Sequence, residues 1–182
     1  MSLVPKKVFF VKGIGHHKSK LGAFEQALRN AGIEKCNLVN VSSILPPHCI
    51  EITKEEGFKQ FLPGQIVYTI ISKVTSNKLN QMISASIGVA KPSDKDLYGY
   101  LSEHHMYDAK PEELGIYTEE LAAEMLATTL GIDFNPEADY DEKREVFKMA
   151  GKIVETKHIT EHATCKKENE WASAVVAAVF IL

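Results

Sequence analysis

The sequence predicts a single α+β domain in which strands outnumber helices. Residues 65–74 and 82–90 are rich in β-branched side chains, which favour strands. Residues 21–31 and 118–130 place apolar side chains three or four positions apart, as on one face of a helix. No linker, repeat or low-complexity tract interrupts the 182 residues, a length that suits one domain with one sizeable core.

The first elements are a strand and a helix. Residues 7–11, KVFFV, form a short β-rich run, and the glycines of residues 13–15 are predicted to end it. A helix is expected over 21–31, because Ser19 can cap its first turn and Gly32 follows its last residue.

Strand patterns dominate the middle of the chain. Residues 37–41 alternate between apolar and polar, and 97–104 is a weaker candidate. The strands 65–74 and 82–90 are separated by a polar stretch, 75–80, that suits a hairpin loop.

The C-terminal third is mixed. The helix 118–130 ends before Gly131, the acidic segment 133–145 is expected to be a solvated loop, and 152–163 alternates as a strand. Residues 171–182 are apolar throughout, so periodicity leaves a buried strand and a buried helix equally open there.

Composition narrows the class of protein. The net charge of −3 gives no electrostatic reason to expect nucleic acid or an anionic membrane as a partner. The N-terminal apolar run is too short for a secretion signal or a membrane span, which predicts a cytoplasmic protein. Cys36, Cys49 and Cys165 show no metal-site or disulfide spacing and are expected to be ordinary thiols.

Two patterns imitate known sites. Residues 13–19, GIGHHKS, lie where a phosphate loop would, but His17 stands where the Walker pattern needs glycine, so a tight loop is expected. Residues 158–162, HITEH, match a zinc-protease pattern that requires a helix. The surrounding sequence alternates as a strand, which would separate the two histidines by roughly 13 Å, so exposed polar positions and no metal are expected.

Glu103, followed by His104 and His105, is a candidate general acid or base, since partial burial can tune a carboxyl group towards neutral pH. Without a partner, the same residues are simply the polar end of a strand.

The serine pair in NVSSILPP, residues 40–47, allows a different chemistry. The Ser43 hydroxyl can attack the carbonyl of Ser42 and turn the amide into an ester, if the peptide is strained and a donor stabilises the oxyanion. β-Elimination then leaves dehydroalanine at position 43, and hydrolysis yields a pyruvoyl group. Read alone, the stretch is also a plausible turn, because proline forces Leu45 into an extended conformation.

Several ordered motifs together resemble the pyruvoyl-dependent arginine decarboxylase family. They are NAGI at residues 30–33, CNLVNVSSILPP at 36–47, PGQI at 63–66, ISASIGVAKP at 83–92 and GYLSEHH at 99–105. The resemblance implies a single domain, residues 1–182, folded as a four-layer αββα sandwich. It also implies self-cleavage into a β chain, 1–42, and an α chain, 43–182, and assembly as a homotrimer, leaving open whether trimers pair.

The resemblance also assigns roles to residues. Ser42 and Ser43 flank the cleavage site, and Ser43 becomes the pyruvoyl cofactor. Asn37 assists processing and Glu103 handles protons in catalysis. Glu25, Ser42 and Ile44 line the substrate site, where Glu25 replaces the aspartate that the family usually places near the substrate guanidinium.

The implied reaction converts L-arginine to agmatine and CO₂ through a Schiff base with the pyruvoyl carbonyl, which acts as an electron sink. Agmatine would then serve polyamine synthesis or acid resistance. Two alternatives stay open: a decarboxylase of another amino acid, suggested by the longer Glu25 side chain, and an unprocessed, non-catalytic binding or scaffold protein.

Overall fold

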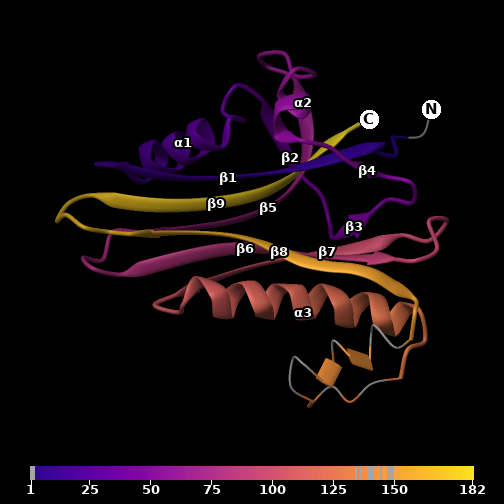
Figure 1. Cartoon of the computed structure of the whole chain (residues 1–182). Helices are drawn as coiled ribbons and strands as arrows, with labels where there is room; N and C mark the ends of the chain where they lie inside the picture. Colours follow the sequence, from indigo (N-terminus) through magenta and orange to yellow (C-terminus); the bar gives the residue numbers. More distant parts are fainter. Residues whose placement is uncertain (1–2, 134, 136, 139–141, 144, 147–149) are drawn as a thin grey trace.

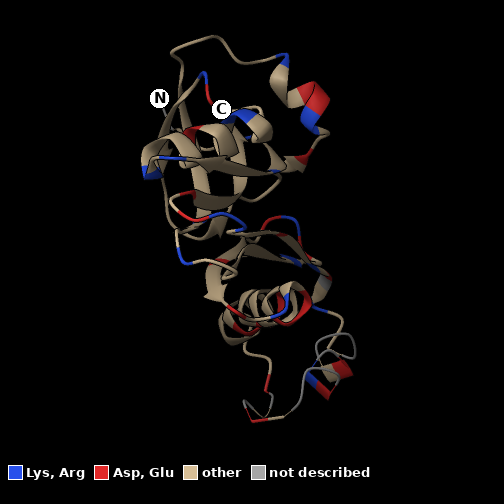
Figure 2. Cartoon of the chain, turned by 90° about the vertical axis from the view of Figure 1, so that its left-hand side faces the viewer, with Lys and Arg blue, Asp and Glu red and all other residues tan. Residues whose placement is uncertain are grey.

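The computed structural model describes residues 3–133, 135, 137–138, 142–143, 145–146 and 150–182, and its elements stack in four layers (Figure 1). One sheet lies beneath α1 and a second sheet lies above α3. A view along the strands shows α3 end-on under the second sheet and α1 over the first (Figure 2). The predicted αββα sandwich is therefore confirmed.

Three helices and nine strands build these layers in the described residues. The helices are α1 (Lys20–Ala31), α2 (Lys54–Phe58) and α3 (Pro111–Thr129). The strands are β1 (Lys7–His17), β2 (Asn37–Asn40), β3 (Ile44–Leu45), β4 (Ile50–Glu51), β5 (Ile66–Ser76), β6 (Met82–Pro92), β7 (Gly99–Tyr107), β8 (Ile153–Thr164) and β9 (Trp171–Ile181).

The strands divide into two largely antiparallel sheets. Sheet A has the order β2-β5-β9-β1-β4, and sheet B has the order β3-β7-β6-β8. The short strands β2 and β4 pair in parallel with β5 and β1, and the other pairs are antiparallel. The main core lies between the sheets and includes Ile70, Val74, Ile87, Leu101 and Val176.

The glycines of the first strand do not end it, contrary to the prediction. β1 continues through Gly13 and Gly15 to His17 and pairs with β9 along its whole length. A Cβ atom on Gly13 would lie 2.3 Å from the carbonyl oxygen of Ala27, and one on Gly15 would lie 2.1 Å from that of Ala23. The glycines are needed because the α1 backbone packs directly against the strand, not because the chain turns.

The first helix matches its prediction closely, and the third extends beyond its own. Ser19 caps α1 by accepting a hydrogen bond from the backbone N–H of Gly22, and Gly32 ends it at φ 79°. α3 begins at Pro111 instead of Thr118, since proline suits the first turn of a helix.

The two clearest predicted strands are present, but they do not form a hairpin. β5 belongs to sheet A and β6 to sheet B, so the polar stretch between them crosses from one sheet to the other. The ambiguous C-terminal run is strand β9. It lies between β5 and β1 with α1 on one face and sheet B on the other, which explains why it is apolar throughout.

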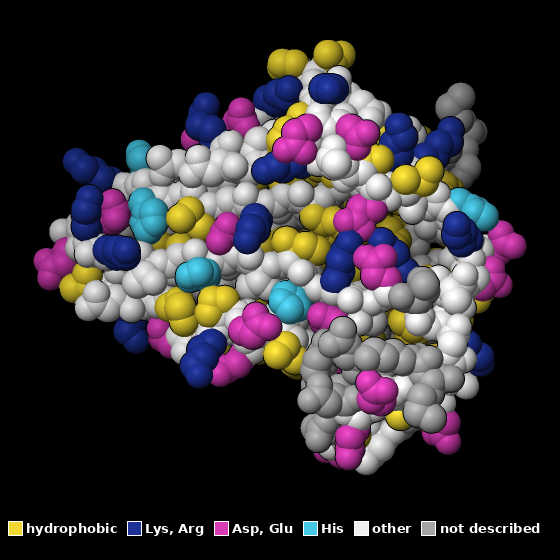
Figure 3. Space-filling model, in the orientation of Figure 1, with side chains coloured by type: hydrophobic (Ala, Val, Ile, Leu, Met, Phe, Trp, Pro, Cys, Tyr) yellow, Lys and Arg dark blue, Asp and Glu magenta, His cyan; other side chains and the backbone are white. Residues whose placement is uncertain are grey.

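Four charged side chains, which we call the seam cluster, join the two sheets: Glu51 of β4, Lys91 of β6, and Glu155 and Lys157 of β8. Lys91 Nζ lies 2.8 Å from Glu51 and 2.9 Å from Glu155, and Lys157 Nζ lies 2.6 Å from Glu51. Burial opposes ionisation of Glu51, but hydrogen bonds from Lys157 and Lys91 outweigh it and lower its pKa. Basic and acidic side chains gather on this face between the sheets (Figure 3).

Part of the acidic segment 133–145 lies outside the described residues. The prediction that this segment is a solvated loop therefore stays a prediction. Within the described part, Lys143 pairs with Glu120 and Glu124 of α3. No helix in the described ranges is long and apolar enough to cross a membrane.

Candidate active site

The serine pair lies where the chain passes from sheet A to sheet B. Before it, β2 ends at Asn40, and the backbone N–H of Val41 donates to the carbonyl oxygen of Thr69 on β5, at 2.9 Å. After it, the carbonyl oxygen of Ser43 accepts a hydrogen bond of 2.8 Å from the backbone N–H of Leu101 on β7. The peptide bond between Ser42 and Ser43 is thus held from both sides by different sheets.

A tight turn surrounds this peptide bond. The carbonyl oxygen of Ser42 accepts a hydrogen bond of 2.9 Å from the backbone N–H of Ile44, which closes a three-residue turn centred on Ser43. Downstream, β3 pairs with the first residues of β7, and a second turn follows in which His48 adopts φ 58° and the Cys49 N–H donates to Pro46. The two prolines therefore serve a turn just beyond β3.

Glu103 lies two residues beyond Leu101 on the same face of β7, beside Ser43. The pKa of its carboxyl group is raised above its usual range, because burial outweighs the opposing effects of its own backbone N–H and of the Ser43 side chain. Such a carboxyl group holds its proton to a higher pH than an ordinary glutamate and suits proton donation.

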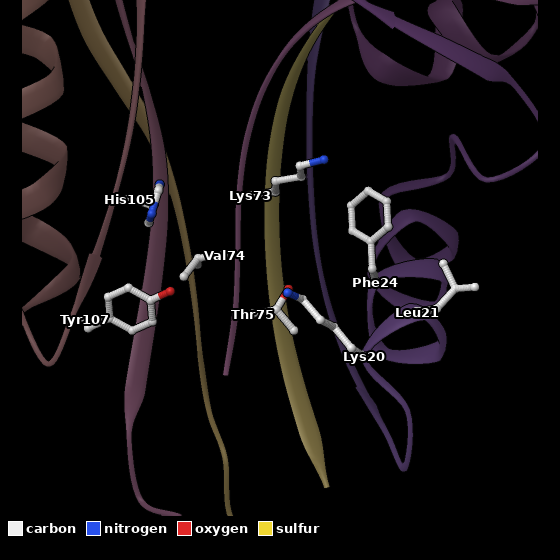
Figure 4. A pocket seen from close by; sticks show the side chains of 8 residues that line it. All are labelled: Lys20, Leu21, Phe24, Lys73, Val74, Thr75, His105 and Tyr107. Atoms are coloured by element: carbon white, nitrogen blue, oxygen red, sulfur yellow. The ribbon is translucent and has the colours of Figure 1, made fainter. Parts of the chain in front are cut away.

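A cavity of about 530 Å³ opens further along the same edge of the molecule (Figure 4). His105 and Tyr107 of β7 line one side, and Phe24 and Leu21 of α1 line the other. Its full lining is Lys20, Leu21, Phe24, Lys73, Val74, Thr75, His105 and Tyr107. Glu103 and His105 share a face of β7, so the cavity begins two residues along this strand from Glu103, and neither Glu103 nor the serine pair lines it.

Two residues expected at the site lie elsewhere within one chain. Asn37, at the start of β2, donates its side-chain amide to the carbonyl oxygen of Gly64 at 2.8 Å. Glu25, exposed on α1, pairs with Arg29 one turn later on the same helix. The fold therefore brings together Ser42, Ser43, Ile44 and Glu103, but not Asn37 or Glu25.

The two imitation motifs serve packing. The glycines of residues 13–19 belong to β1, as described above, and not to a loop. His158 is not fully exposed as expected: its Nδ1 lies 3.0 Å from Glu119 Oε2 of α3, whereas His162 is exposed. No group of three potential metal ligands occurs among the described residues.

Sequence reasoning missed two backbone groups at the site, the N–H of Leu101 and the N–H of Ile44. Any residue except proline carries such a donor, so no residue-type pattern identifies them. The pairing of 44–45 with 99–100 would have been the only usable signal, and two-residue strands carry little periodicity.

Comparison with known proteins gives a consistent result. A family model described as pyruvoyl-dependent arginine decarboxylase matches residues 7–182. A probable pyruvoyl-dependent arginine decarboxylase of Chlorobaculum tepidum is 53% identical over 181 residues, which cover 100% of this chain and 99% of the relative. The pyruvoyl-dependent arginine decarboxylase of Methanococcoides burtonii is 49% identical over 183 residues, covering 99% of this chain and 100% of the relative.

Proposed function

The chain belongs to the pyruvoyl-dependent arginine decarboxylase family, and on that premise we propose that it converts L-arginine to agmatine and CO₂ with a pyruvoyl group made from its own Ser43. The observation that carries the proposal is the placement of Ser43 beside Glu103, whose pKa is raised, at the point where β3 joins β7.

The residues around position 43 fit such a group. The Ser43 carbonyl is held by the Leu101 N–H, so this end of the α chain keeps a fixed position after the bond to Ser42 breaks. The pyruvoyl carbonyl supplies the attachment point for the substrate amine, as a Schiff base, and the electron sink for decarboxylation. Glu103 holds the proton that replaces CO₂ on the α carbon, and its partial burial keeps that proton in place.

The same arrangement around Ser43 supports self-cleavage of the bond between Ser42 and Ser43. The Ser43 oxygen attacks the Ser42 carbonyl carbon, the carbon–nitrogen bond breaks, and the Ser43 nitrogen takes up the hydroxyl proton. Loss of the Cα proton of Ser43 then expels the Ser42 carboxylate and leaves dehydroalanine. Water replaces the nitrogen of its imine tautomer, which leaves as ammonia.

Substrate selection involves Glu25. A carboxylate binds a guanidinium through two hydrogen bonds, and Glu25 already pairs with the guanidinium of Arg29. Decarboxylation of a panel of amino acids, measured as CO₂ release, tests this assignment. A preference for a neutral or acidic amino acid over arginine would contradict it.

The active assembly is a homotrimer in this proposal. Asn37 and Glu25 do not contact Ser43 within one chain, so a second copy must supply them if they act at the site. Val39 and Ile44, which are apolar and exposed on either side of the serine pair, support coverage of this edge by another subunit. The native mass in solution tests the stoichiometry.

Intact mass under denaturing conditions tests the proposal as a whole. We expect two fragments, 1–42 and 43–182, with the larger lighter by one ammonia than simple hydrolysis gives, and arginine-dependent release of CO₂. Ser43→Ala is the matched control and should stay full length and inactive. A stable full-length wild-type chain would instead support the non-catalytic binding protein.

A further inference from the structure

The hydrogen bond that closes the turn at Ser43 involves the atoms that react during self-cleavage. Its acceptor is the carbonyl oxygen of Ser42, which gains negative charge when the Ser43 oxygen attacks the adjacent carbon. Its donor is the backbone N–H of Ile44, at 2.9 Å. A donor already placed on an oxygen that becomes an oxyanion is the arrangement that stabilises acyl-transfer transition states.

We infer that the Ile44 N–H is an oxyanion donor for self-cleavage of the Ser42–Ser43 bond. This inference rests on the proposed function and adds a catalytic group to it. The attack forms the Ser43 Oγ–C bond and moves negative charge onto the Ser42 oxygen. That charge returns to the carbonyl when the carbon–nitrogen bond breaks and the nitrogen is protonated.

The fold fixes the direction of this N–H. Ile44 pairs with Tyr100, and the Ser43 carbonyl is bound by the N–H of Leu101. Because successive N–H groups of a strand point to opposite edges, the ladder between β3 and β7 leaves the Ile44 N–H directed away from β7. On that side, the three-residue turn places the Ser42 carbonyl oxygen within hydrogen-bond distance of the Ile44 N–H.

The turn orients the reacting groups without strain. Ser43 is not among the non-glycine residues with positive φ, so the turn is of the inverse γ type, which is common where strands end. Asn37, which the family resemblance expects to assist processing, donates its side-chain amide to the carbonyl oxygen of Gly64 within the chain. Among the described residues, the Ile44 N–H is a donor that already lies on the Ser42 oxygen.

The test replaces residue 44 by the α-hydroxy analogue of isoleucine in cell-free translation. This change keeps the side chain and turns the N–H into an ester oxygen. Samples are quenched with acid and denaturant, and the mass of fragment 1–42 against time reports self-cleavage, which begins with the acyl shift. We expect this step to slow roughly 10²–10³-fold, the range found when one oxyanion donor is removed.

Two matched controls isolate the donor. The same replacement at Val41 removes a backbone hydrogen bond of equal length to Thr69, and at Leu101 it removes the hydrogen bond to the Ser43 carbonyl. Both should slow cleavage at least tenfold less than the change at Ile44.

Equal rates for the three replacements would overturn the inference and leave the proposed function intact, since the chain would still process. Failure of the unmodified chain to cleave at all would instead overturn the proposed function, and the role of Ile44 with it.

Discussion

Glu103 stands two residues beyond the point where the Leu101 N–H binds Ser43, and this position gives its carboxyl group both a neighbour and partial burial. The two serines of the proposed cleavage site also differ in their burial. Ser42 is exposed, whereas Ser43 is half-buried against β7. Two serines with the same side chain therefore differ in environment, because only Ser43 lies against β7.

The raised pKa of Glu103 predicts the pH dependence of turnover. A proton donor acts in its protonated form, so kcat should be constant at low pH and fall as pH rises through the raised pKa. Glu103→Gln should abolish this limb and lower kcat about 10²–10⁴-fold, as expected for loss of a general acid. The pH profile of the Ser43-processed enzyme and its Gln variant measures both effects.

The stability of the folded state should fall over the same pH range as turnover. Because the folded-state pKa of Glu103 lies above its unfolded value, the folded state loses stability as pH rises from the ordinary glutamate pKa through the raised one. Glu103→Gln removes that loss and should unfold at higher denaturant concentration at neutral pH. A Gln variant with a wild-type pH limb or reduced stability would contradict the assignment.

At this scale, sequence reasoning identified Ser43 and Glu103 from family motifs, and the structure shows that they are neighbours. Their proximity depends on the pairing of β3 with β7, which joins residues nearly sixty positions apart. Nothing in residue type indicates that pairing, so composition and spacing alone left Glu103 as an unpartnered strand end.

Strand β1 shows how packing overrides a local signal. Two glycines within three residues usually mark a turn, and the sequence alone places the strand end there. The structure uses the missing side chains to bring α1 against the strand, with Gly15 opposite the carbonyl oxygen of Ala23. Whether a glycine bends a strand or receives a helix depends on what packs on it, and that information lies in another element.

Gly15→Ala should destabilise the protein by about 3 kcal/mol or more, since its Cβ would lie 2.1 Å from a backbone oxygen that belongs to α1. Gly22→Ala on α1 itself is the control. The three atoms nearest its Cβ belong to the exposed His17 ring, which can rotate away at the expense of its hydrogen bond with Ser19. Alanine favours helix and offsets that loss, so a change within about 1 kcal/mol is expected. Urea unfolding of both variants measures the difference, and equal midpoints would contradict the packing argument.

The remaining elements were predictable where the sequence carries a clear local pattern. One face of α1 is exposed, so its periodicity is visible, and β6 was predicted from its β-branched residues although both of its faces are buried. The first seven residues of α3 were missed because only Leu114 and Gly115 are buried there, which gives no helical repeat, and β9 could not be assigned because both of its faces are buried.

The proposed cleavage between Ser42 and Ser43 would divide the molecule into two unequal pieces that stay interlocked. The smaller piece carries β1, α1 and β2, all of them part of sheet A or its cover. β1 lies inside the sheet and pairs with β9 over eleven residues, from Lys7 to His17. The piece is therefore held by an extended strand ladder after the covalent link is lost.

Refolding should distinguish the cleaved from the uncleaved molecule. Trp171 is the one tryptophan of the chain, pairs with His17 and lies beneath the Lys20 ammonium at 5.7 Å, so its fluorescence reports docking of fragment 1–42. After dilution from denaturant, the fluorescence of processed protein should recover at a rate proportional to concentration. Ser43→Ala should recover independently of concentration, and identical behaviour of the two would contradict the interlocked arrangement.

The seam cluster makes the spacing of the two sheets depend on two forces with different responses to heat and salt. The cost of removing charges from water falls as temperature rises, so Glu51, Lys91, Glu155 and Lys157 contribute relatively more in the heat. Salt screens these pairs where solvent reaches them, whereas burial of the apolar core weakens on cooling. Cooling therefore weakens both contributions, whereas added salt weakens only the charged one. The chain crosses from one sheet to the other at Ser42 and Ser43, so a change in sheet spacing would act on this peptide bond.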